Sequence, residues 1–332
     1  MEEVVIENLF NGDTEAQVQA ARDLSKLSSK QRHKLAERGV TAPLILMLQS
    51  QDYDAIEAAL FALLSLAFGS ERNKIRIMRS GAIPVLLGLL QCQSEALIEL
   101  TIAAMLILSS CTANKLAIAS HGAIQLLVEF LNMSGSSISI SVQAKLDAIA
   151  TLHNLSTCQQ IIPSMVSSGV LFSLLQLIHG SEKSSELVEK VMGLLENVVS
   201  LSESALCEAA GTGGAIRALV ETIEDGSLQC KEHAVGILLL ICQSCRERYR
   251  GVILREGVMP GLLQLSVDGT WRAKTMATQL LLLLRDCPSY GSRNKQSKNE
   301  LIEQIMQEID AGESVEGTTL RLLEEMIAKL ST

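Results

Sequence analysis

A short phrase that begins with glycine recurs six times along the chain and constrains the fold more than any other feature. After each glycine come small or branched residues and then a run of leucine, isoleucine or valine. Successive glycines are 42, 41, 47, 45 and 43 residues apart, a period typical of all-helical solenoids with roughly 40–47 residues per unit. The six glycines are Gly39, Gly81, Gly122, Gly169, Gly214 and Gly257.

Each unit predicts three helices. The glycine suits the left-handed turn that ends a short first helix, because it carries no Cβ. Pro84 and Pro260 fit the first turn of the second helix, where a missing N–H costs nothing. A polar break follows, and then a longer third helix with small and apolar residues at helical spacing, as in residues 58–64 and 146–152. The pattern predicts an all-α fold with negligible strand content.

Composition limits the class of protein and its partners. A chain of 332 residues is too long for one ordinary core, and 48% hydrophobic residues exclude a disordered chain. The net charge of −9 argues against nucleic acid as a partner, which would need a cationic face. The longest apolar run, residues 234–242, is about half of a membrane span, and the N-terminus lacks a secretory signal. We therefore expect no membrane partner, reduced and buried cysteines, and a cytoplasmic and/or nuclear location.

The boundaries of the array follow from the same pattern. Residues 4–10 read as a second helix and 15–28 as a third helix, so the first unit is incomplete and the units number about seven. This start fits either a polar end cap or a missing upstream domain. We expect the array to fill residues 1–289, a polar linker 290–298, and a helical C-terminal cap or a partner-binding tail 299–332. The Ser/Gly-rich stretch 132–139 predicts a mobile loop.

The repeats resemble the armadillo repeats of plant proteins, particularly those that follow a U-box in plant ubiquitin ligases. The stretch 80–90, the pairs Asn73-Lys74 and Asn114-Lys115, and the stretch 152–156 carry the resemblance, which runs from Val4 to about residue 288. A short first helix favours armadillo over two-helix HEAT repeats. The resemblance implies a right-handed solenoid that binds proteins as a scaffold or adaptor, with a role near ubiquitin-dependent regulation. No segment is left over to form a U-box, so we expect no ligase activity. The alternatives are a divergent or fragmentary U-box ligase and, less favoured, a nuclear import receptor.

The resemblance also implies a partner-binding groove along the third helices, with an asparagine ladder that holds an extended segment. When these helices are aligned, only Asn154 and Asn197 place an asparagine at the ladder position. In an earlier third helix, Phe61 lies one turn before the same position. Import receptors carry Trp at that earlier position, whereas the single Trp271 lies elsewhere. The two asparagines either face a bound partner segment or brace neighbouring helices. Four glutamates two turns before the ladder form either an acidic rim for a basic partner or a complement to the helix dipole. They are Glu57, Glu99, Glu189 and Glu232.

No pattern in the sequence indicates catalysis, a metal or a cofactor. Cys242 and Cys245 form one C-x-x-C pair without a second ligand pair, which favours thiols buried in a helix. The five histidines lie in different units. The glycine-rich residues 211–214 lack the Lys-Ser/Thr of a phosphate-binding loop. We therefore predict a protein that is not an enzyme and has neither a cofactor nor a metal.

Overall fold

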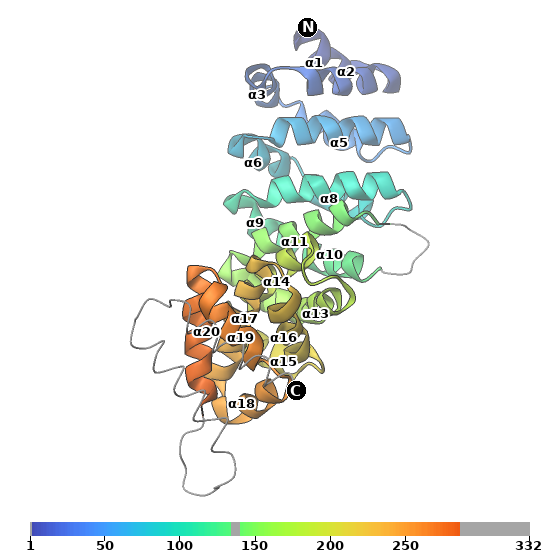
Figure 1. The fold of residues 1–332 in the computed structure, drawn as a ribbon. Helices are drawn as coiled ribbons and strands as arrows, with labels where there is room; N and C mark the ends of the chain where they lie inside the picture. The colour runs from blue at the N-terminus through green and yellow to red at the C-terminus, as the bar shows by residue number, and fades with distance from the viewer. Residues whose placement is uncertain (1, 134–139, 286–332) are drawn as a thin grey trace, which may run out of the picture. The chain divides into compact units, whose positions relative to one another are not determined.

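The structure is a computed structural model that describes residues 2–133 and 140–285. All regular structure in these residues is helical, as the sequence predicts, and they contain no strand (Figure 1). Contacts divide the chain into two compact units, Met1–Ser181 with Glu186–Ala209 and Glu182–Ser185 with Ala210–Thr332. The predicted loop at 134–139 and the predicted linker and C-terminal cap at 290–332 lie outside the described residues.

Three kinds of helix alternate along the chain. The first helices are short: α3 (Ser29–Glu37), α6 (Glu71–Arg79), α9 (Thr112–Ser120), η1 (Gln159–Ile161) with α12 (Ile162–Ser167), α15 (Glu203–Gly211) and α18 (Arg246–Arg255). The second helices are α1 (Glu2–Asn11), α4 (Thr41–Met47), α7 (Ala82–Leu89), α10 (Ala123–Asn132), α13 (Val170–Gly180), α16 (Ala215–Asp225) and α19 (Met259–Asp268). The third helices are α2 (Thr14–Lys26), α5 (Tyr53–Ala67), α8 (Glu95–Ser109), α11 (Val142–Ser156), α14 (Glu186–Leu201), α17 (Leu228–Ser244) and α20 (Trp271–Leu284).

The boundaries between helices have the predicted chemistry. All six repeat glycines have left-handed backbone torsions, with φ between 75° and 87°. Each lies between a first and a second helix, where a side chain would be strained. The polar breaks supply N-caps whose side chains accept a hydrogen bond from the backbone of the following third helix. These caps are Asp13, Asp52, Ser94, Ser141, Ser227 and Thr270.

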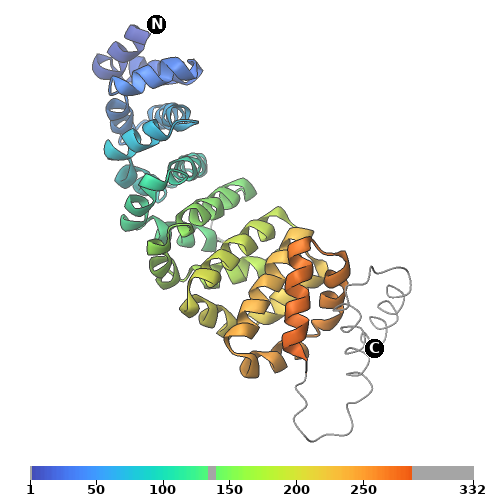
Figure 2. The same ribbon diagram turned by 90° about the vertical axis from the view of Figure 1, so that its left-hand side faces the viewer.

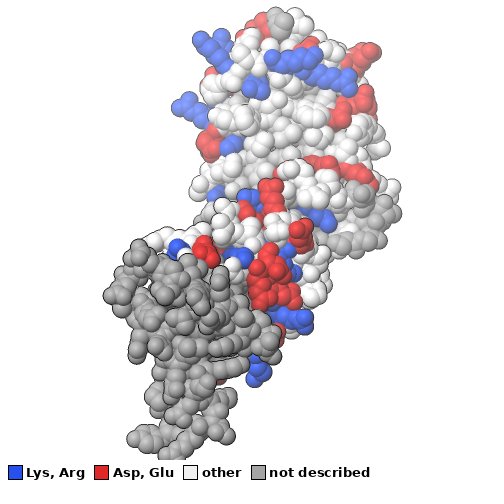
Figure 3. Space-filling model, in the orientation of Figure 1, with Lys and Arg blue, Asp and Glu red and all other residues white. Residues whose placement is uncertain are grey.

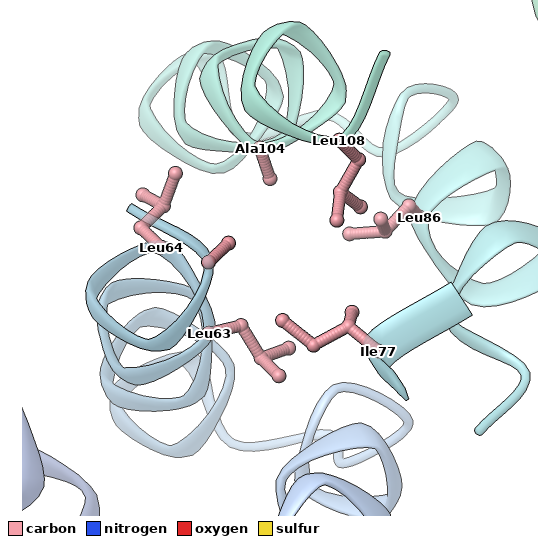
Figure 4. Close-up of a pocket in the computed structure, with 7 residues that line it drawn as sticks. Leu63, Leu64, Ile77, Leu86, Ala104 and Leu108 are labelled. Carbon is pink, nitrogen blue, oxygen red and sulfur yellow. The ribbon is translucent and has the colours of Figure 1, made fainter. Parts of the chain in front are cut away.

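Stacked third helices form the core. In the first compact unit α2, α5, α8, α11 and α14 lie side by side, and in the second unit α17 lies against α20 (Figures 1 and 2). Helix α5 buries nine of its fifteen residues, and Ala58, Ala59 and Ala62 let its neighbours approach closely. A purely apolar pocket remains between α5, α6, α7 and α8, with an empty volume of ≈ 230 Å³ that includes open solvent (Figure 4).

Buried asparagines tie the first helices α6 and α9 to the third helix before each of them. Asn73 and Asn114 are 2% and 3% exposed. The side-chain amide of Asn73 donates to the Leu66 carbonyl at 2.8 Å, and that of Asn114 donates to the Leu108 carbonyl at 3.1 Å. Both carbonyls belong to the last turn of a third helix, where no intrahelical donor is available. The Asn73 amide therefore satisfies a buried carbonyl that the helix leaves open, whereas the Leu108 carbonyl also accepts from the backbone N–H of Cys111 at 3.3 Å.

The basic residue that follows each of these asparagines contacts the C-terminal end of the third helix of its own unit. Lys74 Nζ donates to Ser110 Oγ at 2.8 Å, and Lys115 Nζ donates to Thr157 Oγ1 at 2.5 Å. Ser110 and Thr157 are the C-caps of α8 and α11. In the second compact unit, Arg250 stands at the same place and donates to the carbonyl of the last residue of α20 at 2.9 Å. These cations lie where the dipole of a third helix favours positive charge.

In the described residues, no single helix has both the length and the apolar character to cross a bilayer. One bent pair, Gln159–Ser167 with Val170–Gly180, reaches the required length and hydropathy, with a bend of 73° between its two parts.

Candidate functional site

The two ladder asparagines lie on neighbouring third helices and are half-buried. Asn154 Nδ2 on α11 donates to Ser109 Oγ at 3.1 Å and to the Leu106 carbonyl at 3.4 Å on α8. Asn197 Nδ2 on α14 donates to Ser156 Oγ on α11 at 2.7 Å. Each amide nitrogen thus braces the preceding third helix, which is the structural role that the sequence left open.

The amide oxygens of these two side chains differ from the amide nitrogens in their hydrogen bonding. Within the described part of the chain, no group donates a hydrogen bond to Oδ1 of Asn154 or of Asn197. A carbonyl oxygen on a half-buried side chain can accept from a ligand while the NH₂ group keeps its own bond. The brace and a contact with a bound segment are therefore compatible at both positions.

Two of the four predicted glutamates also connect neighbouring third helices. Glu99 on α8 accepts a hydrogen bond from the backbone N–H of Ser141, the N-cap of α11, at 3.1 Å. Glu232 on α17 accepts from the hydroxyl of Thr270, the N-cap of α20, and from Arg272 at 3.1 Å. Each carboxylate thus complements the N-terminus of the following third helix.

The other two glutamates make contacts within their own helices. Glu57 accepts a hydrogen bond from the hydroxyl of Tyr53, one turn earlier on α5, at 3.3 Å. Partial burial raises the pKa of the Tyr53 hydroxyl, and the Glu57 carboxylate raises it further. Glu189 on α14 lies 3.8 Å from the Lys190 ammonium. Glu57, Glu99 and Glu189 belong to the first compact unit and Glu232 to the second.

Phe61 is exposed, as its predicted place on the third-helix face requires, and it has two aromatic companions that the sequence analysis did not single out. Tyr53, Phe61 and Phe68 are 42%, 47% and 72% exposed, and all three belong to α5 or its C-cap. Positions 53, 57, 61 and 68 fall within about a quarter of a helical turn. Helical spacing of aromatics in a chain with 3% aromatic residues could have revealed this face.

The prediction that the cysteines are buried is correct for some of them and wrong for others. Cys242 is fully buried and burial raises the pKa of its thiol, although Arg246 and Arg250 partly oppose that shift. The prediction of buried cysteines is wrong for Cys245, which is exposed because it lies at the junction of α17 and α18, and for Cys207, which is also exposed. Among the described residues, no group of three or more His, Cys, Asp or Glu is arranged to hold a metal ion.

Plant U-box proteins are similar to this chain over most of its length. U-box domain-containing protein 45 of Arabidopsis thaliana is 31% identical over 276 residues, which are 81% of this chain and 34% of that protein. U-box domain-containing protein 17 of the same plant is 31% identical over 289 residues, or 83% of this chain and 37% of that protein. The chain spans about a third of the length of these relatives. No family model matches the chain.

Solved structures show the same fold at low sequence identity. An engineered protein superposes with a TM-score of 0.75 at 19% identity, covering 99% of this chain and 78% of the other. A structure described for the interaction between cadherin and beta-catenin gives a TM-score of 0.72 at 16% identity, with 93% and 58% covered. Together with the three-helix order of the repeats, these likenesses show an armadillo-repeat solenoid.

Proposed function

We propose that this armadillo-repeat solenoid is a protein-binding scaffold that captures a segment of a partner along α11 and α14. The observation that carries the proposal is the pair Asn154 and Asn197, whose half-buried amides repeat on adjacent third helices and each keep one carbonyl oxygen without a donor among the described residues. Peptide N–H groups of an extended segment would donate to these oxygens. The groove is therefore a hydrogen-bonding surface for a backbone.

The plant U-box relatives support a role in ubiquitin-dependent regulation, with the chain acting as a substrate-binding arm. The scaffold is proposed not to be an enzyme, and its location to be the cytoplasm and/or the nucleus. A second candidate is an E3 ubiquitin ligase in which this array binds the substrate, because the relatives carry U-box in their names and the chain covers only about a third of their length. An auto-ubiquitination assay on the purified chain decides between the two. Activity above a control without the chain would favour the ligase.

Partner capture tests the groove directly. Affinity purification from plant extract, followed by mass spectrometry, identifies partners of the wild-type chain, and their affinity is then measured for Asn154→Ala/Asn197→Ala. Two lost hydrogen bonds at about 0.5–1.5 kcal/mol each predict affinity weakened by roughly tenfold or more.

The matched control for that experiment is Ser156→Ala. It removes the brace that Asn197 makes with α11 and leaves both asparagines in place. We expect this variant to melt at a lower temperature and to keep its partner affinity. If the double asparagine variant melts lower but binds its partner as tightly as wild type, the asparagines only brace the helices and the groove assignment fails.

A further inference from the structure

The exposed face of α5 is the most aromatic surface of the described chain. The protein has five Phe, three Tyr and one Trp, and three of these residues, Tyr53, Phe61 and Phe68, lie exposed on this one helix. We call them, together with Glu57 between them, the α5 aromatic face. Aromatic side chains dominate the energetics of many protein interfaces, and exposed apolar side chains that cluster mark an interaction surface.

Packing between repeats does not require an aromatic residue at position 61. The equivalent positions of the other units after the first are small. They are Ala103, Ala150, Gly193, Gly236 and Ala277. On the adjacent α8, Leu100, Ala103 and Ile107 are half-buried, so an uncharged surface continues from α5 onto α8 (Figure 3). Phe61 therefore projects beside an apolar strip on α8, formed by Leu100, Ala103 and Ile107, that a partner side chain can cover.

Carboxylates border this surface where the third helices begin. Asp52, Asp54 and Glu57 lie at the start of α5, and Glu95 and Glu99 lie at the start of α8. Figure 3 shows acidic side chains along the right-hand edge of these repeats. Arg22 on α2 offsets part of this charge through its ion pair with Asp54 at 3.4 Å. The border favours a ligand that brings positive charge next to its apolar groups.

We propose that the α5 aromatic face anchors a partner segment in which apolar side chains alternate with Lys or Arg. The inference rests on the proposed scaffold function and gives the partner its chemistry: apolar groups cover Phe61, Phe68 and the α8 strip, and the cations meet the acidic border. Residues 300–310 of the chain itself fit poorly, since they contain Glu300, Glu303, Glu308 and Asp310 and no Lys or Arg. A second copy of the chain is an outcome that the test distinguishes.

Fluorescence anisotropy with labelled twelve-residue peptides tests the proposal on the full chain. One peptide alternates Leu and Lys, a second alternates Leu and Glu, and a third alternates Ser and Lys, so charge and apolar content vary separately. We expect the Leu/Lys peptide to bind tightest. Phe61→Ala/Phe68→Ala should weaken its affinity by about tenfold or more, because each anchor is an interface aromatic. The control Phe172→Ala removes a side chain that is 54% exposed on the second helix α13 and should leave affinity unchanged.

Three results would overturn the inference. One is equal binding of the Leu/Glu and Leu/Lys peptides, or no binding of either. Another is unchanged Leu/Lys affinity in Phe61→Ala/Phe68→Ala at an unchanged melting temperature. The third is a wild-type dimer in sedimentation velocity that the double variant converts to a monomer, which would assign the face to self-association. If Asn154→Ala/Asn197→Ala abolishes binding of the Leu/Lys peptide and Phe61→Ala/Phe68→Ala does not, the groove proposed along α11 and α14 is supported. In that case only the proposal for the α5 aromatic face is wrong.

Discussion

The repeat glycines act through backbone conformation alone. A Cβ placed on Gly122 would meet no atom within 4 Å, and the same holds for Gly88 inside α7. The two positions differ in φ, which is +87° at Gly122 and helical at Gly88. Steric crowding therefore cannot distinguish them, and any difference between substitutions there reports the left-handed turn itself.

Substituting these two glycines should give opposite results. Gly122→Ala forces a side chain into the left-handed region and should lower the free energy of unfolding by about 1–2 kcal/mol. Gly88→Ala restricts the unfolded chain and suits a helix interior, so it should raise that free energy by about 0.5–1 kcal/mol. Urea unfolding followed by circular dichroism measures both. Changes of the same sign would show that the turn does not require glycine.

At the scale of the element, the third helices α11 and α20 are held at the N-terminus by the third helix of the unit before and at the C-terminus by the first helix of their own unit. Glu99 contacts the N-cap of α11, and Lys115 contacts its C-cap. Helix α20 is held in the same way by Glu232 and Arg250. Negative charge meets the positive end of the dipole and positive charge meets the negative end, so both contacts stabilise the stack.

The buried asparagines of the first helices offer the sharpest test of these ties. Asn73→Ala removes the donor to the Leu66 carbonyl and leaves that buried oxygen without a partner. We expect the free energy of unfolding to fall by about 1–3 kcal/mol. Gln143→Ala is the control, because this side chain is exposed and bonds only to Asp147, so the change should stay within about ±0.5 kcal/mol. An equally small effect at both sites would show that water replaces the Asn73 amide.

The sequence predicted helices, turns and caps because these depend on neighbours within a few residues. It placed Asn154 and Asn197 on the third-helix face but left their role open, since Ser109 and Ser156 lie 45 and 41 residues away. Whether such groups meet depends on how far one third helix slides along the next. The same offset between neighbouring third helices brings Glu99 to Ser141. The local sequence pattern does not reveal this offset. The prediction of a buried thiol is wrong at Cys245 for a related reason, because a thiol at a helix junction follows no helical face.

At the scale of the whole molecule, contacts are local. Within each compact unit a third helix contacts the third helices next to it and the short helices of its own and adjacent repeats. In such a solenoid, stability is close to a sum of unit terms and nearest-neighbour interfaces. Damage at one interface should therefore spread only to the units beside it.

Hydrogen exchange measured by mass spectrometry tests this locality with two matched cavities. Leu152 in α11 and Leu280 in α20 are both fully buried. Leucine-to-alanine changes at such sites cost about 2–5 kcal/mol. Leu152→Ala should speed exchange in α8, α11 and α14, which are in contact, and leave α20 protected as in wild type. Leu280→Ala should do the reverse, loosening α17, α19 and α20 while α8 stays protected. Uniform acceleration across all helices in either variant would mean that the chain opens as one cooperative body, in conflict with nearest-neighbour coupling.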